Sequence, residues 1–418
     1  VNIKILLDAE VGAGRISEKE RDELLPAMAD DVAALVLRHN RAQNLALANA
    51  LSPSGPTAGV LEAWMCQLEE SGHLDRAVDT MPSTTEMNRK MAAGERLVSP
   101  ELCTVLAWTK IALCDAVLAT NLPEDPFVAD RLVGYFPPLL RERFAEQMPA
   151  HRLHREIITT EAVNRFVDSQ GITAYYQLHL QTGADIAQVI RCQLAARSVF
   201  GLGRVETDLT HLGLDAVRTA KIRLALRDLA MGATRWFLNH GGADDIAGTI
   251  ETYRPGIAKL VEKLSELLLG DNADAWQEKV DEVTELGLDR SDAAVVAACD
   301  WGSVLLSVVE ISEEGHPLDE VADAYLTLAR RVDMIRLTRL VEQLPQDRPT
   351  DARVRASLRE DLLQVMSDAT RRALKHGTDN VLVDGGRIVE AIATNPDLAH
   401  CVVMVSDLRS AVGQEATF

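Results

Sequence analysis

The sequence predicts an all-α protein. Apolar residues recur at helical spacing along almost the whole chain, and strand-like alternation is scarce. Of the 418 residues, 47% are hydrophobic and 25% are charged, while only 4% are aromatic. This balance is typical of a soluble globular protein with a sizeable core, in one very large domain or two ordinary ones. If the chain contains a short strand, we expect it at residues 379–384, which have a short apolar centre.

Each predicted helix is a stretch of sequence whose apolar residues form a stripe along one face. The first runs over residues 18–51, and in it Leu35 and Val36 belong to the stripe that should face a core. The later stripes predict helices over residues 101–120, 151–169, 185–199, 215–239, 246–269, 318–331 and 352–376. Together they predict a multi-helix protein with no Rossmann unit.

Short loops rich in Pro and Gly separate the predicted helices. Ser99-Pro100-Glu101 predicts a helix start, with Ser99 as the N-cap and Pro100 where no N–H is needed. Gly12-Ala-Gly14 and Gly201-Leu-Gly203 fall short of the GxGxxG pattern of phosphate-binding loops, and both suit helix ends better. The remaining breaks lie at residues 52–56, 122–126, 136–138, 241–242 and 344–349.

Charge and cysteine usage argue against several classes of protein. The formal net charge is -20, which disfavours nucleic acid and an anionic membrane as partners. The six cysteines lie far apart without a CxxC pair, which favours a reducing compartment. No uninterrupted apolar run reaches the roughly 18 residues of a membrane span, and the N-terminus lacks the order of a secretory signal. We therefore expect a cytoplasmic protein without a membrane segment.

Two histidines near residue 150 invite a metal interpretation. His151 and His154 lie three residues apart, on one face of the predicted helix, but the spacing is not HExxH and no third ligand can be named. We interpret them instead as part of an exposed basic first turn. We assign no metal ligand, no catalytic residue and no cofactor-binding residue in this chain.

A polar cluster in the first long helix is more unusual. Arg38, Arg41 and Asn44 are neighbours on the helix surface and can act together on an acidic or carbonyl-bearing surface. Either they form a solvated face, the usual place of charged side chains, or they form an interface with another domain. A second basic group, Arg371-Arg372 with Lys375 and His376, ends the last predicted helix, where positive charge complements the helix dipole.

Six segments resemble a known family in the same order along the chain. Residues 24–47 resemble the stretch that follows the dinucleotide-binding domain in the large NAD-specific glutamate dehydrogenases of bacteria. The other matching segments are YFPPLLRERF at 135–144, HRLHREII at 151–158, DSQGIT at 168–173, ATRWFL at 233–238 and YRPG at 253–256. The helices beyond residue 256 continue in the same style to the end.

The resemblance implies that this chain is the helical C-terminal region of such an enzyme. Residues 1–7 resemble the segment just after the family's last catalytic motif. Residues 1–14 would therefore be the segment in which the chain leaves the catalytic domain. Helical subdomains would then occupy residues 15–200 and 201–418, divided near Phe200-Gly-Leu-Gly203, where the composition shifts toward long helices and acidic loops. The family's catalytic and nucleotide-binding residues would all precede Val1.

The parent enzymes oxidise L-glutamate with NAD to 2-oxoglutarate, ammonia and NADH. By resemblance, NAD belongs to the parent enzyme, and this chain alone is expected to have no dehydrogenase activity and no NAD site. Its implied role is structural or regulatory. The implied partners are the catalytic domain of the same polypeptide, through Arg38, Arg41 and Asn44, and further copies in a homo-oligomer.

Two other interpretations remain open. The chain could be a freestanding helical scaffold for protein partners, or an independent helical enzyme whose site the sequence does not reveal. Sequence upstream of Val1 separates the three, because a Rossmann fingerprint and a dehydrogenase lysine motif there would support only the first.

Overall fold

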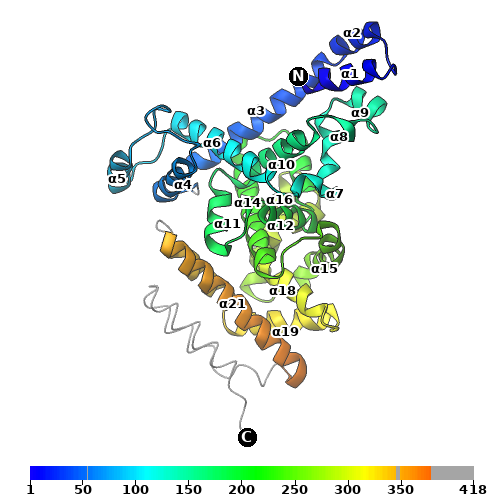
Figure 1. The fold of residues 1–418 in the computed structure, drawn as a ribbon. Coiled ribbons are helices and arrows are strands. Elements are labelled where there is room, and N and C mark those ends of the chain that lie inside the picture. Colours follow the sequence, from blue (N-terminus) through cyan, green and yellow to red (C-terminus); the bar gives the residue numbers. More distant parts are fainter. Residues whose placement is uncertain (54, 345–348, 378–418) are drawn as a thin grey trace. The chain divides into compact units, whose positions relative to one another are not determined.

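A computed structural model describes residues 1–53, 55–344 and 349–377 of the chain. Every regular element in these residues is a helix, and they contain no strand (Figure 1). The all-α prediction is therefore confirmed. The segment at 379–384, where we expected any short strand, lies outside the described residues.

The chain forms two compact units. Unit 1 comprises Val1–Tyr176 and Asp185–Ile190, and unit 2 comprises Gln177–Ala184 and the described residues from Arg191 onward. The polypeptide passes between the units three times: within helix α11 (Ala174–Thr182), between Ala184 and Asp185, and within helix α12 (Ile186–Val199). The division into subdomains at residues 200 and 201 stays a prediction.

Unit 1 begins with three helices that lead into a compact bundle (Figure 1). Helix α10 packs against α6, α3 and α8 and forms the centre of the bundle. The helices of unit 1 are α1 (Asn2–Gly12), α2 (Glu18–Ala27), α3 (Ala29–Leu51), α4 (Ala58–Glu70), α5 (Thr84–Ala92), α6 (Ser99–Leu118), α7 (Pro126–Ala129), α8 (Arg131–Tyr135), α9 (Pro138–Phe144) and α10 (His154–Gln170), with short 3-10 turns η1 (Leu122–Glu124) and η2 (Met148–Ala150).

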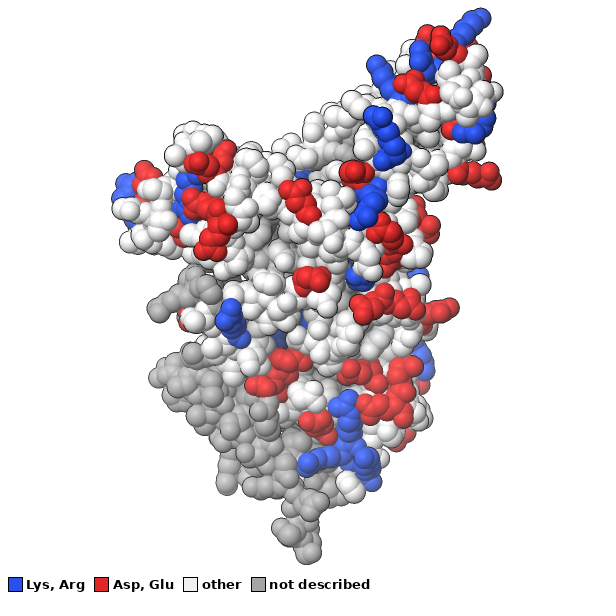
Figure 2. All heavy atoms as spheres, viewed as in Figure 1, with Lys and Arg blue, Asp and Glu red and all other residues white. Residues whose placement is uncertain are grey.

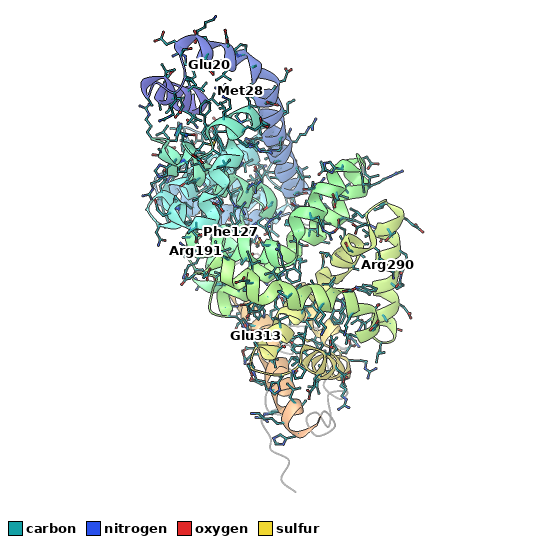
Figure 3. All side chains as sticks on the ribbon, turned by 90° about the vertical axis from the view of Figure 1, so that its right-hand side faces the viewer. Glu20, Met28, Phe127, Arg191, Arg290 and Glu313 are labelled. Atoms are coloured by element: carbon teal, nitrogen blue, oxygen red, sulfur yellow. The ribbon has the colours of Figure 1, made fainter. Side chains whose placement is uncertain are left out.

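The segment predicted as one helix over residues 18–51 is two helices. Helix α2 ends one residue after Pro26, which cannot donate a backbone hydrogen bond and crowds the preceding turn. Met28 then leaves the helical conformation at φ -100° and ψ 3°, and its side chain is fully buried at the corner (Figure 3). The expectation of a single helix was wrong because the apolar stripe continues across the corner.

Unit 2 holds the longest described helix, α21, with 28 residues. Helix α18 packs against α14, α15, α19 and α21 and lies at the centre of the unit. The helices of unit 2 are α13 (Leu202–His211), α14 (Ala216–Asn239), α15 (Ile246–Leu267), α16 (Asp271–Glu285), α17 (Arg290–Ala297), α18 (Gly302–Ser312), α19 (Leu318–Arg331), α20 (Met334–Gln343) and α21 (Pro349–His376), with the 3-10 turn η3 (Ala298–Trp301) between α17 and α18.

One stretch of unit 2 is long and apolar enough to cross a membrane by length and composition alone. Among the described residues it is Arg290–Ser312, which covers α17, η3 and α18 and begins at the residue labelled Arg290 in Figure 3. The sequence prediction overlooked it because Asp300 interrupts the apolar run. Its apolar window is 72% buried inside the structure, as expected for the core of a helical bundle.

Helix ends follow the sequence signals in most but not all places. Gly14 and Gly201 have φ of 70° and 64°, the left-handed conformation that the helix-end interpretation requires. Ser99, however, is already helical, so the predicted N-cap was wrong. The N-cap is Val98, whose backbone N–H donates to the Glu101 carboxylate over 2.7 Å.

Candidate functional site: the exposed face of helix α3 and the buried ionic groups

The three predicted interface residues lie together on helix α3. Arg38, Arg41 and Asn44 follow one another at intervals of three residues, and all three are exposed. Within the described part of the chain, neither guanidinium group has a hydrogen-bond or ion-pair partner. The structure therefore places these polar groups on one accessible face, and their interface role stays a prediction.

Apolar side chains share this exposed face. Val36 is 52% exposed and Leu37 is 54% exposed, although the sequence pattern had placed Val36 on a core-facing stripe. That expectation was wrong because α3 buries only Ala46 and Ala50, near its C-terminal end. The middle of α3 thus presents aliphatic and basic side chains on one broad exposed face, which we call the α3 face (Val36, Leu37, Arg38, Arg41 and Asn44).

The opposite side of α3 faces charged side chains of α10, which also pairs with α6. His39 Nε2 lies 3.6 Å from Glu161 Oε1 on α10, and Lys110 Nζ on α6 lies 2.7 Å from Asp168 Oδ1, also on α10. Burial raises the pKa of the Asp168 carboxyl, although the Lys110 ammonium opposes the shift. Asp168 is the first residue of the DSQGIT segment. This residue of the family-like segment therefore has a structural role, because its ion pair with Lys110 joins α6 to α10.

The first residues of the chain are held by two other segments that resemble the dehydrogenase family, residues 135–144 and 151–158. Asn2 Nδ2 donates to the Tyr135 hydroxyl over 2.9 Å, and His151 Nε2 lies 3.1 Å from the Asn2 carbonyl oxygen. Arg143 adds an ion pair of 2.6 Å with Glu20 on α2. Residues 135–144 and 151–158 therefore hold α1 and α2 against the rest of unit 1.

The interpretation of His151 as an exposed first-turn residue was wrong. His151 is 4% exposed and precedes helix α10, which begins at His154. Its Nδ1 accepts from the backbone N–H of Leu153 over 3.1 Å, so the proton of the neutral ring lies on Nε2, which donates to Asn2. Both ring nitrogens are used for structure, and the described residues contain no group of three side chains suited to a metal ion.

Unit 2 contains an ionic network that sequence reasoning missed. His240, directly after α14, lies between two carboxylates: Nδ1 is 2.8 Å from Glu310 Oε1, and Nε2 is 3.0 Å from Glu360 Oε1. The ring stacks on Trp236 at a centroid distance of 4.0 Å. Burial alone would lower the pKa of His240, but the hydrogen bonds to Glu310 and Glu360 outweigh it and raise the pKa to about 9. At neutral pH the network is an imidazolium clamp joining α14, α18 and α21.

Two of the segments that resemble the dehydrogenase family contact each other in the same region. Trp236 and Phe237 of ATRWFL contact Tyr253 of YRPG, at ring-centroid distances of 5.6 and 5.2 Å. The Trp236 indole N–H donates to the Ser307 hydroxyl on α18 over 3.1 Å. These aromatic residues thus form the core around the clamp.

A second buried charge in unit 2 belongs to Asp292. Its side chain is fully buried and pairs with Arg204, which also reaches Asp289 and Ser291 near the start of α17. Burial raises the pKa of Asp292 to about 6, while the Arg204 charge opposes the shift. The pair ties α13 to α17.

The basic end of the last helix has partners beyond the helix dipole. Helix α21 ends at His376, as the sequence predicted. Arg371 lies 2.8 Å from Glu314 and 3.9 Å from Glu310, the residue that also holds His240. The helix end is therefore linked to the imidazolium clamp.

Cys114 and Cys192 are not activated nucleophiles. Burial raises the pKa of the Cys114 thiol to about 11 and that of Cys192 to about 12, so both remain protonated near neutral pH.

The surface is predominantly acidic: Asp and Glu side chains are spread over the face drawn in Figure 2, consistent with the net charge of -20.

The fold and these buried ion pairs define the chain as an all-α protein region. Comparison with known families shows to which family it belongs. Residues 94–413 match the family model described as glutamate dehydrogenase, C-terminal. The chain belongs to this family. Residues 1–50 match a second model, the catalytic domain of bacterial NAD-glutamate dehydrogenase, and this match includes Arg38, Arg41 and Asn44.

Individual relatives carry the same description. An NAD-specific glutamate dehydrogenase from Pseudomonas aeruginosa is 35% identical over 94% of this chain and 24% of its own length. The NAD-specific glutamate dehydrogenase from Mycobacterium tuberculosis is 32% identical over 87% of the chain and 22% of its own length. One from Halomonas elongata is 29% identical over 87% of the chain and 23% of its own length. The chain thus spans about a quarter of the length of these relatives.

Proposed function

We propose that this chain is the C-terminal helical region of a cytoplasmic NAD-dependent glutamate dehydrogenase, and that it supports the catalytic domain rather than performing the chemistry. The family match over residues 94–413 carries the proposal. The intact enzyme would oxidise L-glutamate with NAD to 2-oxoglutarate, ammonia and NADH. Hydride transfer of this kind needs a nicotinamide held by a dinucleotide-binding domain, and we assign that domain to the preceding polypeptide.

The α3 face is the proposed contact with the catalytic domain. It lies within residues 1–50, which match the family's catalytic-domain model. Its basic groups lack partners among the described residues, and Val36 and Leu37 are both about half exposed. Helix α3 also has an anchored inner side, through His39 and Glu161, so the face is presented on a fixed support.

The expected energies favour a contact of moderate strength. Covering Val36 and Leu37 contributes about 1.5–3 kcal/mol together, on the scale for burying aliphatic side chains. Exposed ion pairs contribute only about 0–1 kcal/mol, whereas pairs desolvated at an interface contribute more. Arg38 and Arg41 therefore become important to stability only where a partner covers them.

The test substitutes the two arginines in the full-length enzyme, as R38A with R41A. The matched control is R336A with R339A, because these residues have the same spacing, are also exposed and lie on α20 in unit 2. We expect the α3 variant to lose at least about 2–4 °C in melting temperature. The control should match the parent, and neither variant should unfold the isolated chain of 418 residues.

Two results would contradict different parts of the proposal. If the α3 variant equals the parent in melting temperature, oligomeric state and glutamate oxidation rate, the α3 face is only solvated and the docking role is withdrawn. If the full-length protein does not reduce NAD with glutamate, the proposed activity itself is wrong.

A further inference from the structure

Three arginines converge in unit 2, beside the imidazolium clamp. Arg355 and Arg359 lie one turn apart on the same face of α21. Arg235 lies on α14, and Asn239, one turn further along α14, donates to Glu360 over 2.7 Å. This contact brings the two arginine-bearing helix segments together.

Most of the hydrogen-bond donors in this cluster are unused. Arg235 donates through Nε to Gln181 over 2.7 Å, and no described residue accepts from its two terminal nitrogens. One terminal nitrogen of Arg355 donates to the Glu342 carbonyl oxygen over 3.0 Å and to the Leu344 carbonyl oxygen over 3.5 Å. One terminal nitrogen of Arg359 donates to the Glu342 carboxylate over 3.4 Å. Each guanidinium has five N–H donors, so the cluster has donors to spare.

Positive charge is in excess around the three side chains. The carboxylates that face them are Glu342, near the end of α20, and Glu360 on α21. Glu360 already pairs with His240 and accepts from Asn239, so its charge is largely committed. Glu342 is 54% exposed and forms a single ion pair of 3.4 Å, with Arg359, so among the described residues three guanidinium groups share one carboxylate that is not already committed.

The cluster is also sheltered from water. The Arg359 side chain is only 13% exposed, and Arg235 and Arg355 are half-buried. Burial lowers the pKa of Arg235, and the nearby guanidinium groups of Arg359 and Arg355 lower it further. Arginine nevertheless stays protonated in proteins, so loss of a proton does not relieve the repulsion between the guanidinium groups, whereas a bound anion would.

We propose that Arg235, Arg355 and Arg359 form a binding site for a small oxyanion, the phosphate or carboxylate group of a ligand, between α14 and α21. Guanidinium forks suit such groups because two parallel N–H donors match two oxygens. The occupied site would join α14 to α21 through the ligand. This inference concerns unit 2 alone and does not depend on the proposed function.

The experiment measures anion binding to the intact chain by isothermal titration calorimetry. Inorganic phosphate and succinate are titrated separately, with sodium chloride at matched ionic strength as the blank. The test variant is R235Q, and the matched control is R353Q, because Arg353 is exposed on the same helix two residues from Arg355 and points to another side. Circular dichroism checks that both variants remain helical.

We expect saturable binding of at least one of the two anions, at least tenfold weaker in R235Q and unchanged in R353Q. Preference for phosphate or for succinate then identifies the source of the oxyanion. If R235Q does not fold, R359Q takes its place with the same expected loss. Absence of saturable binding to the unaltered chain overturns the proposal, as does equal binding by R235Q and R353Q.

Discussion

Helices α3 and α18 both carry aliphatic residues near their centres, but their surroundings are opposite. Of the 11 residues in α18, eight are buried, whereas α3 buries two of its 23. Helix α18 is enclosed by other helices of its own unit, while the centre of α3 contacts the rest of unit 1 along one side only. The comparison shows that aliphatic residues at a helix centre can lie in a core, as in α18, or on an exposed face, as in α3.

The charged groups of unit 2 and those of the α3 face also differ, in whether they have partners within the chain. His240 in unit 2 is held by two carboxylates, whereas Arg38 and Arg41 on the α3 face have no partner among the described residues. Unit 2 thus satisfies its buried charges internally, apart from the arginine cluster. For the α3 face, we propose that the catalytic domain supplies the partners.

The largest expected effect follows from deleting a core side chain on α18. Leu306 is fully buried, so L306A should destabilise unit 2 by about 2–5 kcal/mol through lost burial and the cavity left behind. L37A on the α3 face is the matched change, and in the isolated chain it should alter stability by about 0.5 kcal/mol or less. Thermal unfolding of both variants checks the contrast, and equal losses would show that α3 is a core helix.

A smaller effect should appear in the pH dependence of unit 2. The His240 pKa of about 9 lies above its ordinary value of 6.5. The imidazolium therefore stabilises unit 2 fully below pH 6.5, and this stabilisation is lost as the pH rises through 9. A shift of this size corresponds to on the order of 3 kcal/mol.

Melting temperatures at pH 6, 7.5 and 9 test this expectation. The unaltered chain should lose stability across that range, and H240Q should lose much less. H211Q is the control, because His211 is exposed in the same unit and has no partner among the described residues. A slope in H240Q equal to that of the unaltered chain would show that the clamp is not the titrating group.

The sequence predicted most helices closely because amphipathic stripes and caps are local signals. Helix α19 occupies Leu318–Arg331, as predicted. Helix α14 begins after Asp215, whose side chain accepts from the backbone N–H of Arg218 over 2.9 Å. The corner at Met28 was missed although Pro26 marked it, because the apolar pattern on both sides was read as one stripe.

The ionic sites could not be predicted from sequence because their partners are distant along the chain. His240 pairs with residues 70 and 120 positions later. Spacing along one helix identifies only neighbours three or four residues apart, which is why Arg38, Arg41 and Asn44 were found and the clamp was not. The i and i+4 spacing of Arg355 and Arg359 was visible, but not the approach of Arg235 from α14.

We propose that a partner domain covers the α3 face in the intact enzyme. Amide hydrogen exchange tests it most directly, by comparing the isolated chain with the full-length enzyme under the same conditions. We predict that amides of residues 33–44 exchange markedly more slowly in the full-length enzyme, whereas those of α18 exchange slowly and equally in both. Equal exchange of residues 33–44 in the two proteins would contradict the account.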